Sequence, residues 1–337
     1  MEKMHKELSL EEDSMTPVFS KVSWIKGGLV LLVFGYLLFF QPYATGYFEN
    51  RDPLFKDILQ GFKRDGGEWS FGYIVPFIVG LLFYLKRKEL LLLPIKPSFG
   101  VGLPVLILGF LLYFGGYKAN VTYGGYLAIQ ILLAGTCLWF LGVRWFFKSF
   151  WLWCLFGMMW PNVFLIQPIS TPLREVMVVV TSAFLNLIGV DALRNGMAIL
   201  TDTPDPYTQE PIVLSIAQGC SGLRSLFALV MIGFVFAAFA LKSEWQRWVL
   251  MATIPLVAIA GNFVRMLMLY FGSRFFGTVF AIGEGEGNES SFHIGSGLVV
   301  FVVALILLSL FVEVLKHGIK RFFKKKTVTR KVIGKAS

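Results

Sequence analysis

The chain has 337 residues, of which 56% are hydrophobic and only 15% are charged, and its mean hydropathy is +0.68. Ordinary soluble domains carry roughly 25% charged residues, so this apolar load cannot be buried in one water-soluble core. The composition therefore excludes a soluble enzyme, a disordered chain and a nucleic-acid-binding domain, and no nucleic acid is expected as a partner. It predicts an all-α polytopic membrane protein in contact with membrane lipid.

The apolar segments of spanning length follow one another along the whole chain, and together they predict a single integral membrane domain over residues 1–337. A spanning helix needs about 20 mostly apolar residues. Eight such segments are expected near 27–47, 69–85, 99–116, 124–143, 149–166, 215–241, 248–272 and 293–315.

A ninth apolar stretch, at 171–190, is interrupted by polar residues that include Arg174 and Glu175. We interpret it as an interfacial or re-entrant helix on the outer face of the membrane. The polar stretch that follows, 191–211, contains three prolines and three aspartates. It predicts a small extended or hairpin element over the outer mouth.

The basic residues indicate the orientation. With the N-terminus inside, the inner segments hold 21 Lys and Arg and the outer segments hold 8, as the positive-inside rule requires. Nine of the basic residues lie in the tail at 316–337, directly after an apolar segment. Both termini are therefore expected to be cytoplasmic. Eight spans place the two termini on the same side of the membrane, whereas a ninth crossing by the stretch 171–190 would place them on opposite sides, so this stretch is expected not to cross.

Three polar groups are expected at the outer ends of the last three spans. Cys220 opens the sixth span, where the free amides and the dipole of the helix favour a thiolate, and Arg224 follows it by four residues. Asn262 and Arg265 share a face of the seventh span, and His293 opens the eighth. Because a charge inside a span costs on the order of 3 kcal/mol, Arg224 and Arg265 are candidate functional residues.

Several of these residues also have a plainer interpretation. Cys220 could be a small buried hydrophobe, although the neighbouring Arg224 and glycines argue against it. Arg265 could be a snorkelling anchor of the helix end, and a lone His293 could be structural. Cys137 and Cys154 have Leu, Trp and Phe neighbours, and we interpret them as small buried hydrophobes. A thiol, an imidazole and a guanidinium at one rim nevertheless supply the nucleophile, the acid–base group and the oxyanion stabiliser of acyl transfer. The combination favours a cysteine acyltransferase or protease.

The sequence resembles the exosortase/archaeosortase family, whose members carry a Cys-Ser-Gly segment, an Asn-x-x-Arg segment and a later His on successive transmembrane helices. The resemblance is specific over about residues 155–315, and upstream of that it rests on hydropathy alone. The matching residues are Cys220, Ser221, Gly222, Arg224, Asn262, Arg265 and His293.

This resemblance implies a membrane cysteine transpeptidase that acts on exported proteins at the outer face of the cytoplasmic membrane. Its substrates would end in a sorting signal made of a short motif, a transmembrane helix and a basic cluster. The enzyme would cleave at the motif and pass the protein to an acceptor nucleophile. No metal and no organic cofactor is expected.

The resemblance also implies roles for the matching residues. Cys220 would be the nucleophile, His293 the proton-transfer residue, and Arg265 the group that stabilises the oxyanion or the thiolate. The remaining four would support catalysis or bind substrate, namely Arg224, Asn262, Ser221 and Gly222. Two alternatives stay open: a purely hydrolytic membrane cysteine protease, and a non-catalytic assembly factor or transporter for surface polysaccharide.

Overall fold

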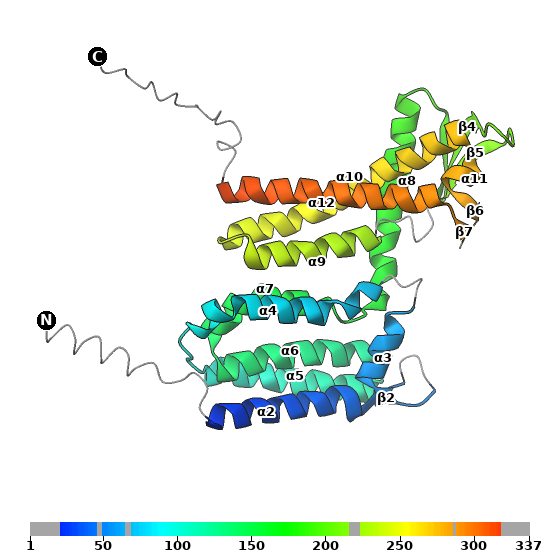
Figure 1. Cartoon of the computed structure of the whole chain (residues 1–337). Helices are drawn as coiled ribbons and strands as arrows, with labels where there is room; N and C mark the ends of the chain where they lie inside the picture. Colours follow the sequence, from blue (N-terminus) through cyan, green and yellow to red (C-terminus); the bar gives the residue numbers. More distant parts are fainter. Residues whose placement is uncertain (1–20, 46–48, 65–68, 216–222, 286–287, 318–337) are drawn as a thin grey trace, which may run out of the picture. The chain divides into compact units, whose positions relative to one another are not determined.

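The computed structural model describes residues 21–45, 49–64, 69–215, 223–285 and 288–317. This part of the chain is mostly helical, and the protein divides into two compact units, residues 1–164 and residues 165–337 (Figure 1). Within the described ranges, five helical segments are long and apolar enough to cross a membrane. They are Phe99–Ala119, Thr122–Phe140, Val163–Leu187, Glu244–Phe276 and Ser291–His317.

Unit 1, residues 1–164, is built around one close pair of apolar helices, α5 (Phe99–Ala119) and α6 (Thr122–Phe140). Their backbones approach closely because Gly102 has no side chain: a Cβ there would lie 2.7 Å from the backbone nitrogen of Trp139. Small residues allow this kind of contact between membrane helices. The other long elements of unit 1 are α2 (Lys21–Gly35) with its π-helical continuation η1 (Tyr36–Phe40), α4 (Val75–Leu91) and α7 (Val143–Gly157).

The short elements of unit 1 connect these helices at one end. Strand β1 (Pro42–Ala44) pairs antiparallel with β2 (Asp52–Pro53), and β2 leads directly into helix α3 (Leu54–Gly61). A 3-10 turn, η3 (Ser70–Tyr73), precedes α4.

Unit 2, residues 165–337, contains three packed helices: α9 (Leu223–Phe239), α10 (Glu244–Phe276) and α12 (Ser291–His317). Their shared core includes Leu229 of α9, Ile254 of α10 and Leu308 of α12. Ser243 caps the start of α10 in a capping box with Gln246, as expected for a helix N-terminus. The side-chain amide of Gln246 also donates to the carbonyl of Leu315 at 2.6 Å, so the start of α10 is tied to the end of α12.

Helix α8 (Ile166–Leu187), which a 3-10 turn η4 (Val163–Leu165) precedes, runs at a steep angle to the other long helices of unit 2 (Figure 1). Its buried residues Met177 and Leu185 pack against Met266 and Tyr270 of α10. After α8 comes an antiparallel sheet in the order β3 (Ala192–Asn195), β4 (Ala198–Pro204) and β5 (Pro211–Ser215). A single turn, α11 (Thr278–Ala281), and the β6–β7 hairpin (Gly283–Gly285, Asn288–Glu289) separate α10 from α12.

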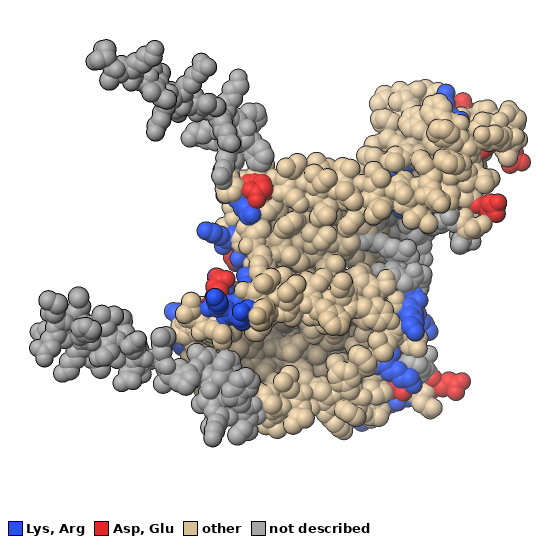
Figure 2. Space-filling model, in the orientation of Figure 1, with Lys and Arg blue, Asp and Glu red and all other residues tan. Residues whose placement is uncertain are grey.

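Charged side chains lie toward the ends of the units. On the visible face of each unit, Lys, Arg, Asp and Glu gather near its two ends, and a band of uncharged side chains lies between them (Figure 2). A helical unit that crosses a bilayer has this distribution, because charges in the hydrocarbon region are costly.

The structure corrects several expected boundaries. Helix α7 spans Val143–Gly157 rather than 149–166, and the first helical segment ends at Phe40 rather than near residue 47. Both expected spans contain a proline, Pro161 or Pro42. A proline removes a backbone donor and disfavours helix in the residue before it, so neither helix continues through its proline.

The expected hairpin element at 191–211 is confirmed by strands β3, β4 and β5, and with the two short hairpins it corrects the all-α prediction. The stretch 171–190 lies within the continuous helix α8 as far as Leu187. Its steep angle to α10 suits an interfacial helix, while its length and composition would also allow it to cross. The count of eight spans therefore stays a prediction. The expected cytoplasmic termini lie outside the described residues.

Candidate functional site

His293 lies at the start of α12 and is only 3% exposed. The hydroxyl of Ser290 accepts the His293 backbone N–H at 3.0 Å, as a helix N-cap does. The same hydroxyl donates to the carbonyl of Ala281 at 3.0 Å, at the end of α11. On the other side, the hydroxyl of Ser296 donates to the carbonyl of His293 at 2.8 Å. The backbone that carries the imidazole is therefore held by side chains before and after it.

Arg265 projects from α10 onto α12. Its guanidinium carbon Cζ lies 3.3 Å, and its Nε 3.4 Å, from the position that a Cβ on Gly297 would occupy. The Arg265 Nε is buried and makes no hydrogen bond to any described residue. His293 and Gly297 are four residues apart and share a face of α12. The guanidinium thus lies against α12 about one helical turn from His293.

Asn262 and Arg265 line the same small cavity, which is otherwise mostly apolar. Asn262 is 5% exposed and precedes Arg265 by three residues on α10. Both line a cavity of about 10 Å³, together with Gly297 of α12 and Ser225 of α9. This volume is close to the minimum that holds one water molecule. Helices α9 and α10 therefore bring polar side chains to one point, against the glycine that α12 presents there.

The proposed nucleophile lies outside the described residues, as do Ser221 and Gly222. Helix α9 begins at Leu223, three residues after Cys220 in the sequence. Arg224 lies in the first turn of α9, next to Ser225, which lines the cavity. The structure therefore brings together Asn262, Arg265 and the face of α12 that carries His293. The placement of Cys220 beside them stays a prediction.

The sequence analysis assigned no role to three residues that contact this site or support its backbone, namely Ser225, Ser290 and Gly297. Two of them carry a local signal. Ser290 stands three residues before His293, which is the N-cap spacing, and Gly297 stands four residues after it on the same helix face. Ser225 has no such signal, because its place at the cavity depends on how α9 packs against α10.

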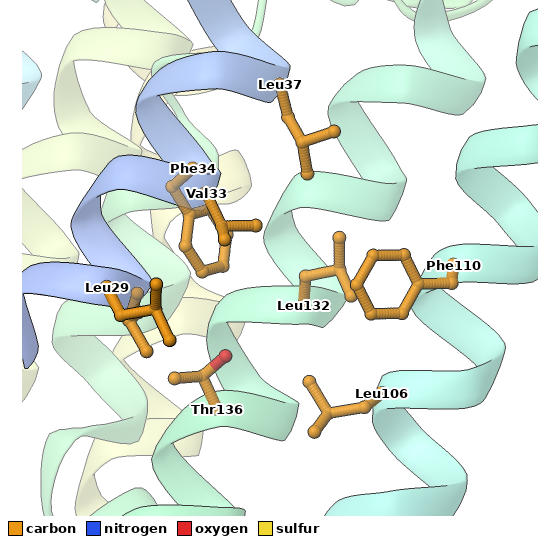
Figure 3. A pocket seen from close by; sticks show the side chains of 9 residues that line it. Leu29, Val33, Phe34, Leu37, Leu106, Phe110, Leu132 and Thr136 are labelled. Atoms are coloured by element: carbon orange, nitrogen blue, oxygen red, sulfur yellow. The ribbon is translucent and has the colours of Figure 1, made fainter. Parts of the chain in front are cut away.

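The cavity of unit 1 is chemically different. Its volume is about 160 Å³, and it lies among α2, α5 and α6. In Figure 3 its lining is hydrocarbon except for the hydroxyl of Thr136. Cys137 and Cys154 of the same unit are free thiols and are partly buried. No group of three potential metal ligands from His, Cys, Asp and Glu occurs among the residues that the structure describes. The lining of the unit 1 cavity itself offers no group for acid–base or nucleophilic chemistry.

A comparison with protein-family models finds a match that covers most of this chain. The family model described as transmembrane exosortase (Exosortase_EpsH) matches residues 64–310. The chain belongs to the transmembrane exosortase family. A search of the curated proteins gives no match, and a search of the solved structures gives none either.

The exosortase match extends farther than the specific resemblance in the sequence. It begins before α4 and ends within α12, so it includes residues of both compact units. It contains all seven candidate residues from Cys220 to His293. Helices α4 to α7 are therefore part of the exosortase fold, although the sequence showed only their hydropathy.

Proposed function

We propose that this exosortase is a membrane cysteine transpeptidase that cleaves C-terminal sorting signals of exported proteins and transfers the proteins to an acceptor. The observation that carries the proposal is the position of the Arg265 guanidinium against Gly297, one turn from the buried His293 on α12. Helix α9, which follows Cys220 in the sequence, lines the same cavity through Ser225. A nucleophile, a base and a cation on three packed helices would suffice for acyl transfer.

In the first step, the His293 imidazole takes the proton of the Cys220 thiol, and the thiolate attacks the carbonyl carbon of the scissile peptide. The Arg265 guanidinium donates hydrogen bonds to the oxyanion that forms. The intermediate collapses with cleavage of the C–N bond, and the His293 imidazolium protonates the leaving amine. A thioester at Cys220 and a free C-terminal fragment remain.

In the second step, the acceptor nucleophile loses its proton to His293 and attacks the thioester carbonyl. The Cys220 thiolate leaves, and the exported protein is joined to the acceptor. Asn262, Arg224, Ser221 and Gly222 are proposed to support these steps or to bind substrate. Both steps balance in atoms and charge with these side chains alone, so the proposal includes no metal and no organic cofactor.

The proposed location is the cell membrane, with the active site on the extracytoplasmic side. The distribution of Lys and Arg along the chain supports this orientation. Exported substrates that end in an apolar helix would reach the site through the surrounding lipid. Cys220 should then react with a membrane-impermeant maleimide added from outside, while Cys137 and Cys154 should not. Labelling of Cys220 from the cytoplasmic side alone would overturn the orientation.

Capture of the thioester tests the chemistry. The enzyme in lipid vesicles is incubated with a host protein that ends in a short motif, an apolar helix and a basic cluster, with and without hydroxylamine. A transpeptidase should release the protein as a hydroxamate, and Cys220→Ala should release nothing. A product that is a free carboxylate even with hydroxylamine present would favour the hydrolytic alternative. Cleavage by Cys220→Ala would contradict the proposal.

A further inference from the structure

The carboxylate of Asp205 joins two distant parts of unit 2. Asp205 follows β4 directly and is 3% exposed. Its Oδ1 accepts the backbone N–H groups of Tyr207 at 2.8 Å and Thr208 at 3.1 Å, which close the turn at the tip of the β4–β5 hairpin. Its Oδ2 accepts the backbone N–H of Thr278 at 2.5 Å. Thr278 is the first residue of α11, so this bond docks the hairpin tip on the segment between α10 and α12.

Two neighbouring features hold this contact in place. Gly277, just before Thr278, has φ +88°, and a Cβ there would lie 2.6 Å from the ring of Tyr207. A glycine is therefore required for the Thr278 amide to come this close to the hairpin. The hydroxyls of Thr203 on β4 and Tyr270 on α10 are also hydrogen-bonded at 2.8 Å. The hairpin tip is thus fixed at two points.

The docked segment continues to His293. Helix α11 is a single turn, and the carbonyl of its last residue, Ala281, accepts the hydroxyl of Ser290. The same hydroxyl accepts the backbone N–H of His293. A continuous path therefore runs from the Asp205 carboxylate through one helical turn and the Ser290 hydroxyl to the backbone of His293.

The Asp205 carboxylate is a strong acceptor throughout the neutral range. Burial by itself raises the pKa of this group. The hydrogen bonds from Thr278, Tyr207 and Thr208 favour the ionised form and lower the pKa from 3.8 to about 2. Hydrogen bonds to an ionised acceptor are roughly twice as strong as bonds between neutral groups, so the docking of the hairpin on α11 is a firm contact.

We propose that Asp205 and Ser290 are positioning residues, which set the place of the His293 imidazole relative to the Arg265 guanidinium. The inference rests on the proposed function, in which His293 moves the proton. It assigns the β4–β5 hairpin a part in catalysis, because the hairpin acts on His293 through α11 rather than by contact with the reacting atoms.

Kinetics of matched variants test the inference. Asp205→Asn and Ser290→Ala should each lower kcat about fivefold with KM unchanged, which is the rate ratio that corresponds to a transition state weakened by the typical free energy of one helix cap. Ser290→Thr keeps the hydroxyl and should restore the rate. The controls are Asp202→Asn, an exposed aspartate of the same hairpin, and Ser291→Ala, an exposed serine next to Ser290. Both controls should match the wild type.

A second measurement follows His293 without the reaction. Modification by diethyl pyrocarbonate, located by mass spectrometry, should be faster at His293 in both variants, with the more exposed His317 as the reference in the same chain. Unchanged modification together with unchanged kcat would overturn the inference. A higher KM at unchanged kcat would also overturn it, because the hairpin would then bind substrate. If His293 is modified faster in the two variants but the wild-type protein cleaves no substrate, the result would support the positioning role of Asp205 and Ser290 and contradict the proposed transpeptidase activity.

Discussion

The two compact units differ in how they accommodate buried polar side chains. In unit 1, the Gln130 side chain donates to the carbonyl of Trp153 at 2.7 Å and accepts the indole N–H of Trp160 at 2.8 Å. The Asp57 carboxylate accepts the hydroxyl of Tyr126 at 2.9 Å. These are the expected arrangements for polar groups away from water. These buried polar groups of unit 1 are therefore satisfied within the unit.

In unit 2 some buried polar atoms are hydrogen-bonded, as at Asp205 and Ser182, but others are not. The hydroxyls of Ser170, Thr181 and Ser273 and the Nε atoms of Arg174 and Arg265 are buried and make no hydrogen bond to any residue that the structure describes. No buried side-chain atom of unit 1 is in this state within the described ranges. A buried hydroxyl without a partner costs about 1–3 kcal/mol by protein mutational data. These atoms therefore lower the stability of unit 2 in a way that has no counterpart among the described residues of unit 1.

The largest expected effect comes from the three cysteines. Cys220→Ala in unit 2 should lower processing of a co-expressed substrate by about 10⁴-fold or more, as removal of a catalytic nucleophile does. Cys137→Ala and Cys154→Ala in unit 1 should process normally. The processed fraction at matched enzyme levels measures this. Unchanged processing in Cys220→Ala would remove the catalytic assignment, and a loss in either unit 1 variant would break the contrast between the units.

Arg265→Lys separates a catalytic arginine from an anchor. Loss of one well-placed oxyanion donor costs about 100- to 1000-fold in rate, and a single ammonium cannot reproduce the planar fork of a guanidinium. We therefore expect that Arg265→Lys inserts normally into the membrane and processes substrate about 100- to 1000-fold more slowly. The control is Arg274→Lys, an exposed arginine in the last turn of the same helix. Near-normal processing by Arg265→Lys would make Arg265 a snorkelling anchor.

Gln130→Leu tests whether the buried hydrogen bonds of unit 1 serve stability alone. The substitution leaves the Trp160 indole N–H and the Trp153 carbonyl without their partner, and each buried group left unsatisfied costs about 1–3 kcal/mol. The free energy of unfolding in detergent should fall by about 3 kcal/mol, while processing per folded molecule stays unchanged. Gln60→Leu, at an exposed glutamine of α3, should change neither quantity. A specific loss of processing in Gln130→Leu would show that unit 1 takes part in the reaction.

The sequence predicts the elements whose cause is local. Apolar runs locate the membrane helices, and the proline-rich polar stretch at 191–211 locates the hairpin that strands β4 and β5 form. Helix ends were predicted less well, because the predicted apolar spans pass through Pro42 and Pro161 while the helices end before them. A correct use of those two prolines would have shortened both predicted spans.

Contacts between distant residues could not be predicted in this way. Arg265 meets Gly297 only because α10 and α12 pack side by side in one register. Asp205 meets Thr278 across 73 residues of sequence, and nothing in the hairpin sequence indicates which amide it binds. The candidate residues were found by their chemistry. Of the two residues proposed to position His293, Ser290 has a local signal in its N-cap spacing, whereas Asp205 became evident only from the structure.

The smallest expected effect concerns one hydroxyl of α8. Thr181 is fully buried, and its Oγ1 makes no hydrogen bond to any described residue. Valine has nearly the same shape without the hydroxyl, so Thr181→Val removes the desolvation cost and loses no hydrogen bond. We expect the free energy of unfolding to rise by about 1 kcal/mol, at the low end of the cost of a buried hydroxyl without a partner.

The neighbouring Ser182 supplies the matched control for this prediction. It is also buried, but its hydroxyl donates to the carbonyl of Val179 at 3.2 Å. Ser182→Ala therefore loses a hydrogen bond along with the hydroxyl and should lower the free energy of unfolding by about 1 kcal/mol. Denaturation of both variants in the same detergent gives the sign of the change in the free energy of unfolding for each of them. If Thr181→Val is destabilised as much as Ser182→Ala, the Thr181 hydroxyl has a hydrogen-bond partner in the folded protein. At this position, unit 2 would then satisfy a buried hydroxyl as unit 1 satisfies its buried polar groups.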